Sequence, residues 1–377
     1  MSFERIDSEA LMQRALVLAE GGRGSVAPNP MVGAVLARHV GENRYEIVSE
    51  GWHERCGGPH AEVAALEAAR RAGVDPRGLT MAVTLEPCAH QGKTPPCADA
   101  LVRAGIGEAI VATVDPFEAV SGRGIEMLRD AGITVRVGVC EAKAKALIAP
   151  FVKRVTRGLP WVIAKWAQTI DGKIATRTGE SKWISGPAAR RLVHRWRGEV
   201  DAVMVGVGTA AADDAELTAR DAPPKRIARR IVVDPNCRLP AQAKLLQPGG
   251  PPTTVICGRD IHKDLPGHVQ RLAVDADTAR GGLRLTDALR ELVEQHRVTE
   301  VLVEGGAKLV GSLLDAELVD ELRVFVAPTL LGDAEGLSPV AGPARVSLSE
   351  ASAWRCVEAT PVEADVLLRY VRCESHA

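Results

Sequence analysis

The chain has 377 residues, of which 46% are hydrophobic and 25% charged, and its 47 basic and 48 acidic side chains give a formal net charge of −1. This balance is typical of a soluble globular protein and excludes an intrinsically disordered or collagen-like chain. Aromatic residues make up only 3% of the sequence, which argues against ladders of stacked rings that hold single-stranded nucleic acid.

The length predicts two domains, at about 100 to 200 residues for each. The N-terminus, MSFERIDSEALMQ, lacks the apolar stretch of a secretory signal. No apolar run approaches the roughly 18 residues of a membrane span. We therefore expect a soluble, cytoplasmic protein whose eight cysteines are mostly buried thiols, with any close pair suspected of binding metal.

The first half alternates segments with helical and strand periodicity. Ser8 is a predicted helix N-cap, and Gly21 and Gly22 end that first helix. The order of elements predicts helices on both faces of a mixed sheet. Strands are predicted over residues 31–37, 45–51, 80–85, 108–113 and 133–138, and further helices over about 60–72, 96–104, 122–131 and 141–157.

The second half predicts another α/β unit. We place a first domain at residues 1–146 and a second at 147–377, with the connection ending at Gly158-Leu159-Pro160. Strands are predicted over residues 161–167, 201–207, 230–234, 253–257, 300–305 and 321–328 and in a final pair, and helices over 188–196, 286–296 and 307–315.

A candidate zinc site lies in the first half. His60 starts a predicted helix, Cys88 follows a strand, and Cys97 lies near the start of the next helix. One histidine and two thiolates leave a fourth tetrahedral position open, as catalytic zinc requires. Glu62 lies two residues after the histidine and is placed to exchange protons with water at the metal. H-x-E followed by P-C and a second cysteine is the signature of zinc nucleobase and nucleotide deaminases.

The spacing of the cysteines narrows this prediction. Eight residues separate Cys88 from Cys97 in EPCAHQGKTPPC, whereas the general signature has two. With Pro28-Asn29-Pro30-Met31-Val32-Gly33 and Gly51-Trp52-His53, this loop resembles the family of bifunctional riboflavin-biosynthesis deaminase-reductases. The resemblance covers nearly the whole chain. It implies an α/β fold with a cytidine-deaminase-like three-layer N-terminal domain and a dihydrofolate-reductase-like α/β C-terminal domain.

The resemblance also implies which residues hold the deaminase substrate. Asn29, His53, His90 and Lys93 would line the pyrimidine and phosphate pocket around the zinc; an amide can pair with a base edge and an ammonium with an anion. The family usually has D-P-N-P in a later substrate loop, but this chain has Phe117 at the Asn position. A phenyl ring cannot make that hydrogen bond, so another group must recognise the ring there, or the deaminase activity is weakened.

The second half begins with a strongly basic segment. Residues 153–197 carry eleven lysines and arginines against Asp171 and Glu180. The segment fits a solvated helix face, a nucleic-acid surface or a pocket for phosphorylated small molecules, and the neutral chain argues against the nucleic acid. Two turns, VGVGTAA after one strand and Gly305-Gly306 before a helix, offer backbone amides to a phosphate-bearing cofactor.

Here AKWAQTIDGK, GESKWISG, GTAAADDAELTAR and VEGGAKLVGSLL resemble the reductase domain of the same family, which uses NADPH. Lys165 and Asp213 are our candidates for positioning the reacting ribose carbon and managing its proton. Ala215 stands where the family commonly has Pro, which affects loop stiffness. The resemblance implies NADPH contacts from Ala167, Trp183, Thr209, Asp213, Gly306, Ala307, Lys308, Leu309 and Val310. It implies substrate contacts from Ser181, Arg197, Leu217, Arg220 and Glu304. Each of the two arginines would bind the phosphate through two N–H groups of its guanidinium.

We therefore expect an enzyme of riboflavin biosynthesis that contains Zn²⁺ and uses NADPH. It would deaminate a phosphoribosyl pyrimidine and then reduce its ribosyl group to ribityl, as a homo-oligomer without nucleic-acid or membrane partners. Two alternatives remain: an RNA-editing deaminase whose basic second half binds RNA, and a protein whose zinc is only structural.

Overall fold

The structure is a computed structural model that describes residues 5–89, 95–117, 121–220, 223–343 and 346–373. The chain forms two compact units that divide between Arg157 and Gly158. The boundary predicted after residue 146 falls inside helix α5 (Glu141–Arg157), which belongs wholly to the first unit. The buried Ala144 joins the core formed by the first helix and the sheet of that unit, which explains why the helix stays with it.

The first unit contains a five-stranded sheet in the order β2-β1-β3-β4-β5. β1 pairs antiparallel with β2 and β3, whereas β3, β4 and β5 are parallel. Its strands are β1 (Gly33–His39), β2 (Tyr45–Trp52), β3 (Thr80–Val83), β4 (Glu108–Val111) and β5 (Thr134–Val137). Its other helices are α1 (Ser8–Ala19), α2 (Ala61–Arg71), α3 (Cys97–Ala104) and α4 (Arg123–Asp130).

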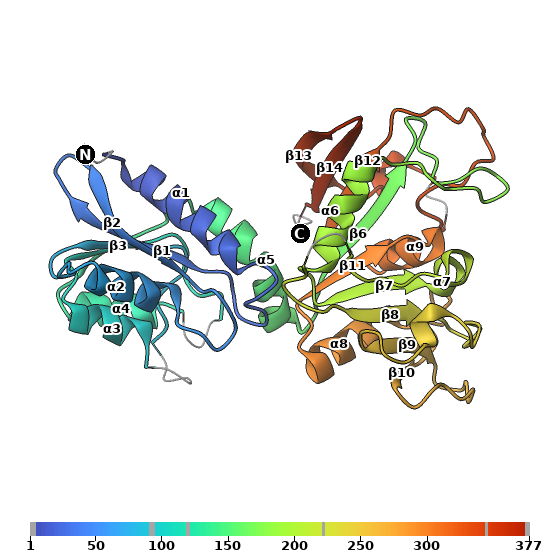
Figure 1. Cartoon of the computed structure of the whole chain (residues 1–377), viewed down its shortest axis with the longest axis horizontal. Helices are drawn as coiled ribbons and strands as arrows, with labels where there is room; N and C mark the ends of the chain where they lie inside the picture. Colours follow the sequence, from blue (N-terminus) through green and yellow to red (C-terminus); the bar gives the residue numbers. More distant parts are fainter. Residues whose placement is uncertain (1–4, 90–94, 118–120, 221–222, 344–345, 374–377) are drawn as a thin grey trace. The chain divides into compact units, whose positions relative to one another are not determined.

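Helices cover both faces of this sheet (Figure 1). Because side chains alternate along a strand, Ala34 and Leu36 of β1 pack in a core with α2, α3 and α4. Val35 and Ala37 pack on the opposite face with α1 and α5. The three-layer arrangement predicted for the N-terminal domain is therefore confirmed.

Glycine in β2 sets the position of α2. A Cβ on Gly51 would lie 2.6 Å from the carbonyl oxygen of Ala61 and 2.4 Å from the amide nitrogen of Ala65. Any larger residue would push the first turn of α2 away from the sheet. The N-cap of this helix, His60, is therefore held at a fixed place beside the strands.

The second unit contains a nine-stranded sheet in the order β10-β9-β8-β7-β11-β6-β12-β14-β13. The strands from β10 to β12 in this order are parallel, and β14 and β13 add an antiparallel pair. The strands are β6 (Trp161–Gln168), β7 (Ala202–Gly206), β8 (Arg229–Val233), β9 (Thr253–Gly258), β10 (Val269–Val274), β11 (Glu300–Glu304), β12 (Glu321–Val326), β13 (Trp354–Val362) and β14 (Asp365–Arg372). The helices are α6 (Pro187–Arg197), α7 (Val207–Asp213), α8 (Leu285–His296) and α9 (Ala307–Asp315).

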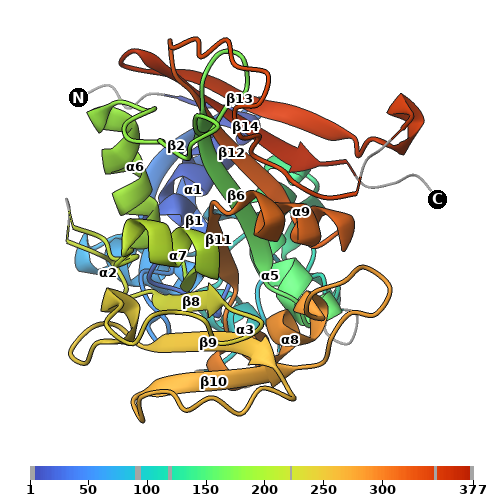
Figure 2. The same cartoon turned by 90° about the vertical axis from the view of Figure 1, so that its right-hand side faces the viewer.

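Two aliphatic cores lie on the two faces of this sheet. α8 and α9 pack on one face and α6 and α7 on the other, as Figure 2 shows. The mixed α/β fold with two sheets is as predicted. The sequence prediction missed β10, because its polar Gln270 and Arg271 interrupt the apolar pattern of a short edge strand. It also missed α7, whose glycine-rich start was read as the end of a strand.

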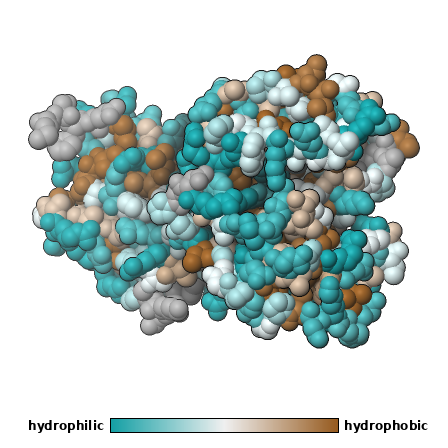
Figure 3. Space-filling view, turned by 45° about the vertical axis from the view of Figure 1, so that its right-hand side comes forward, coloured by the Kyte–Doolittle hydropathy of each residue, from teal (hydrophilic) through white to brown (hydrophobic). Residues whose placement is uncertain are grey.

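On the face in Figure 3, the second unit is mostly hydrophilic, with separate hydrophobic groups between. Among the described helices, none is long and apolar enough to cross a membrane.

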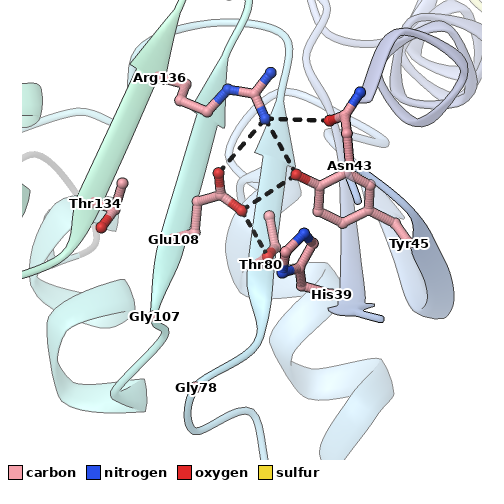
Figure 4. Close-up of a pocket in the computed structure, with 9 residues that line it drawn as sticks. All are labelled: His39, Asn43, Tyr45, Gly78, Thr80, Gly107, Glu108, Thr134 and Arg136. Carbon is pink, nitrogen blue, oxygen red and sulfur yellow. Dashed lines mark hydrogen bonds and ion pairs between the residues drawn. The ribbon is translucent and has the colours of Figure 1, made fainter. Parts of the chain in front are cut away.

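A network of polar side chains lies at the end of the first sheet where β3, β4 and β5 begin (Figure 4). The buried Tyr45 donates its hydroxyl hydrogen to Glu108 over 3.4 Å and accepts from the Arg136 guanidinium over 3.1 Å. Thr80 donates to the same carboxylate over 3.0 Å. Tyr45, Thr80, Glu108 and Arg136 therefore form one network that joins the start of β2, β3 and β4 to β5.

We expect Tyr45→Phe to lower the unfolding free energy of the first unit by about 1 kcal/mol, because it removes both hydroxyl bonds inside a buried network. Native-state hydrogen exchange of the β1 and β3 amides at increasing denaturant measures that loss. Tyr370→Phe in β14 is the matched control, since its hydroxyl has no hydrogen-bond partner among the described residues. A stability of β1 and β3 unchanged by Tyr45→Phe would contradict the network's role.

Candidate functional site

Three metal-ligand side chains meet at one edge of the first unit. His60 caps α2, Cys97 is the first residue of α3, and Cys88 follows the end of β3. His60 Nδ1 lies 3.2 Å from Cys97 Sγ and 3.6 Å from Cys88 Sγ. All three ligand atoms lie within 4.8 Å of one another. The structure thus brings together the three zinc ligands predicted from the sequence.

The chemistry of these donors fits a zinc ion. Hydrogen bonds from the Cys97 thiol and His60 lower the pKa of Cys88 to about 4, whereas the neighbouring Cys88 sulfur and burial raise the pKa of Cys97. Two thiolates this close repel each other unless a cation lies between them. One imidazole and two thiolates are typical zinc ligands, and three protein ligands leave a position for water or substrate.

Glu62 lies in the first turn of α2, beside the three ligands. Its side chain is almost fully buried, with 3% of the residue exposed. Burial raises the pKa of its carboxyl to about 7. Burial outweighs the opposing charge of the neighbouring His60, so a buried carboxyl at this place is suited to carry a proton.

His53 and Asn29 adjoin the ligands. His53 Nδ1–H donates to the carbonyl oxygen of Pro59 over 2.9 Å, and its Nε2 accepts from the Asn29 amide over 3.1 Å. The His53 and His60 rings lie edge to face with centroids 5.3 Å apart. Burial lowers the pKa of His53, which keeps the ring neutral in these two roles.

The other predicted residues of this site are less completely placed. His90 and Lys93 lie outside the described residues. Phe117 is 49% exposed, and its amide donates to Asp115 Oδ1 over 2.9 Å. The sequence prediction missed Glu86, a buried carboxylate two residues before Cys88 that binds backbone amides of the segment after β4. The only signal was an acidic residue at the end of an otherwise apolar strand, within the quoted EPC motif.

In the second unit, Lys165, Arg197 and Glu304 come together at the sheet. Glu304 ends β11 and lies opposite Lys165 of the neighbouring strand β6. Arg197 Nε and Nη2 bind the two oxygens of Glu304 over 2.6 and 2.7 Å, and its Nη1 donates to the Thr218 carbonyl. Since Glu304 already occupies the guanidinium fork, Arg197 does not offer a free fork to a substrate phosphate, the geometry that we expected.

Burial dominates the electrostatics of this group. It lowers the pKa of Lys165. The negative charge of Glu304 offsets part of this shift. Burial also opposes ionisation of Glu304, but Arg197 outweighs it and holds the pKa of that carboxyl below its usual range. The site therefore combines an ammonium whose pKa burial lowers with a carboxylate whose pKa Arg197 lowers.

Of the predicted cofactor residues, Thr209 and the stretch from Gly306 to Val310 lie where α7 and α9 begin. The missing Cβ of Gly306 would lie 3.3 Å from Thr209 Oγ1, so glycine, with φ of 87°, lets the two segments touch. As in any helix, the first amides of α9, at Ala307, Lys308 and Leu309, have no acceptor within the helix. The Val310 amide instead bonds to Gly306 O, and its side chain is buried. Val310 therefore offers a cofactor no exposed polar group.

Asp213 and Trp183 are joined through neighbouring residues. Lys182 Nζ lies 2.9 Å from the Asp213 carboxylate, an ion pair that the sequence prediction missed. No hydrogen bond or ion pair links Asp213 to Lys165 in the described part of the chain, so the two candidate catalytic residues are not in direct contact. Trp183 is 72% exposed and stacks with Arg190, whose guanidinium carbon is 4.4 Å from the ring centroid. Ser181 is exposed beside them.

The remaining predicted residues differ in what they can contact. Leu217 is buried in the core with φ of 55°, so a substrate could meet only its backbone. Arg220 is exposed and pairs with Glu216 over 3.1 Å. Ala167 is half-buried in β6.

Comparisons with known proteins cover both units. The zinc-binding region of cytidine and deoxycytidylate deaminases matches residues 5–113, and the RibD C-terminal domain matches residues 160–368. The chain is 42% identical to the riboflavin biosynthesis protein RibD of Aquifex aeolicus, over 87% of this chain and 88% of that one. It is 38% identical to RibD of Escherichia coli, over 97% of this chain and 100% of that one.

Solved structures agree. A deaminase/reductase from Thermotoga maritima has a TM-score of 0.84 at 36% identity and covers 97% of this chain and 98% of its own. RibD from Acinetobacter baumannii has a TM-score of 0.82 at 35% identity, covering 97% and 99%. With a zinc-binding deaminase unit and a reductase unit that uses a nicotinamide cofactor, the chain belongs to the RibD family, the bifunctional deaminase-reductases of riboflavin biosynthesis.

Proposed function

We propose that the first unit deaminates the diaminohydroxyphosphoribosylaminopyrimidine named for the Thermotoga relative, and that the second reduces the resulting 5-amino-6-(5-phosphoribosylamino)uracil with NADPH. The reduction converts the ribosyl group to ribityl. The observation that carries the proposal is the His60, Cys88 and Cys97 cluster with the buried Glu62 beside it. The choice of NADPH over NADH as the cofactor rests on the sequence resemblance. The homo-oligomeric state and cytoplasmic location stay predictions.

In the deaminase, the protein's residues hold the ring and move protons. When bound, zinc lowers the pKa of the water it holds towards about 7. Glu62 would take a proton from that water and pass it to the ring nitrogen and then to the departing amine. The Asn29 amide donates to His53, which fixes its orientation. Its carbonyl oxygen has no hydrogen-bond partner among the described residues and suits an amino group of the pyrimidine.

In the reductase, the cofactor supplies hydride to the ribose carbon, and the protein must supply a proton to the ring oxygen as the carbon–oxygen bond opens. Lys165 is our proton donor, because burial lowers the pKa of its ammonium. Glu304, held by Arg197, would accept hydrogen bonds from ribose hydroxyls. The first amides of α9, against Thr209, are suited to a cofactor phosphate. Asp213 would then act by holding Lys182 and the exposed Trp183 near the cofactor.

The RNA-editing alternative has less support. Of the basic segment, Arg177, Arg191 and Arg197 pair with acidic side chains. These pairs reduce the free positive charge that a phosphate backbone would need.

Replacing a ligand tests the metal assignment. We expect Cys97→Ser to lower the zinc content well below one ion per chain and to abolish ammonia release, because a neutral hydroxyl is a far weaker zinc ligand than a thiolate. Cys356→Ser, at an exposed free cysteine, is the control and should keep the metal. Metal analysis of the purified variants decides, and full zinc occupancy in Cys97→Ser would refute the site.

Replacing Glu62 tests the proton carrier. Glu62→Gln should keep zinc but release ammonia at least about 100-fold more slowly, since the amide cannot shuttle a proton. Reduction of preformed aminouracil substrate should be unchanged, which serves as an internal check of folding. Glu67→Gln, at an exposed position of the same helix, should have no effect. Unchanged ammonia release in Glu62→Gln would rule out the role.

Replacing Lys165 tests the reductase. Lys165→Met keeps the length of the stem and loses the charge, so NADPH should still bind while turnover falls at least about 100-fold. Ammonia release should stay normal. Cofactor binding by fluorescence and turnover by NADPH absorbance separate the two effects, with the exposed Lys225→Met as control. Normal turnover in Lys165→Met would exclude it as the proton donor.

A further inference from the structure

Glu86 is a buried carboxylate whose two oxygens accept four backbone amides. It is 5% exposed and lies two residues before the ligand Cys88. Its Oε2 accepts from the amides of Asp115 and Gly122 over 3.0 and 2.9 Å. Its Oε1 accepts from Gly124 and Ile125 over 2.9 and 3.4 Å. One side chain therefore joins the turn before a metal ligand to two separate stretches of the chain after β4.

Gly124 brings the same two regions into direct backbone contact. A Cβ at this position would lie 1.9 Å from the carbonyl oxygen of Pro87, which no side chain can tolerate. The start of α4 therefore packs against the residue next to Cys88. The contact and the Glu86 bonds act in the same direction, because both hold α4 and Asp115 at the metal-ligand turn.

This arrangement is more than a helix cap. An exposed Ser or Asp would satisfy the amides at the start of α4, without the cost of burying a charge. Glu86 also binds the Asp115 amide, and Asp115 in turn accepts the amide of Phe117. Through Asp115, Glu86 thus also holds the backbone of Phe117, the position at which the family resemblance implies a substrate contact, relative to the turn before Cys88.

We propose that Glu86 is a positioning residue of the deaminase. It holds Asp115–Phe117 and the start of α4 against the Cys88 turn, so that the wall of the substrate pocket is in place before the pyrimidine binds. The proposal rests on the deaminase function proposed above. It makes Glu86 a determinant of substrate affinity, with little influence on the chemical step at the metal.

Glu86→Gln tests the proposal with almost no change in volume. Its amide NH₂ must face two backbone N–H groups that the carboxylate accepted, so that pair of bonds is lost. We expect KM for the diaminopyrimidine to rise about tenfold while kcat stays within about twofold, which is the signature of lost binding rather than lost catalysis. Zinc content and the reductase rate on preformed aminouracil should be unchanged. Glu67→Gln is the matched control.

Gly124→Ala tests the same junction from the other side and leaves the charge of Glu86 intact. Its Cβ must push α4 away from Pro87, so we expect the same rise in KM with zinc retained. The control is Gly267→Ala, where an added Cβ meets nothing within 4 Å. Hydrogen exchange of the unaltered protein needs no variant: the amides of Asp115 and Gly122 should exchange much more slowly than those of exposed loops.

Three results would overturn the proposal: an unchanged KM in Glu86→Gln, a loss of zinc or of reductase activity in that variant, or fast exchange of the Asp115 and Gly122 amides in the unaltered protein. The second result would make Glu86 a structural support only. Failure of the unaltered protein to release ammonia would instead refute the proposed deaminase function. The two failures are therefore distinguishable.

Discussion

The crowding of two thiols and one imidazole within 4.8 Å constrains the whole first unit. The two sulfurs cannot both carry charge so close together unless a cation joins them. To bring the three ligands together, the starts of α2 and α3 and the segment after β3 must lie at the same end of the sheet. Gly51 permits it by letting α2 lie directly on β2. The metal ligands thus lie at one end of the strands of this sheet, and the Tyr45 network stabilises the other end.

In the second unit, an ion pair between Arg197 and Glu304 compensates the buried charge. Glu304 ends a parallel strand, and Arg197 at the end of α6 holds both of its oxygens. The side chain of Lys165, beside this pair, makes no hydrogen bond to another described residue, and burial lowers the pKa of its ammonium. In both units burial shifts the pKa of an acid or base in the site: it raises that of Glu62 at the start of α2 and lowers that of Lys165 in β6.

The sequence predicts the metal site well because His60 and Cys97 lie at helix starts and Cys88 lies in the loop between β3 and α3. Spacing and residue type are then sufficient, as they were for His60, Cys88 and Cys97. The sheet and helix pattern follows from apolar periodicity for the same reason. The four amides on Glu86 and the Lys182–Asp213 pair were not predictable, because each joins loops distant in sequence. The occupied fork of Arg197 and the buried Val310 show the same limit, since a motif does not reveal which of its polar groups are already used.

If one chain carries two consecutive catalysts, ammonia release and NADPH oxidation must be coupled. Both can be followed together in a single reaction started from the diaminopyrimidine. We predict that ammonia appears first and that NADPH oxidation follows after a lag. At the end of the reaction, the amounts of ammonia released and NADPH oxidised should be equal. Oxidation of NADPH without prior ammonia release, or ammonia release with no oxidation of either nicotinamide cofactor, would contradict the account.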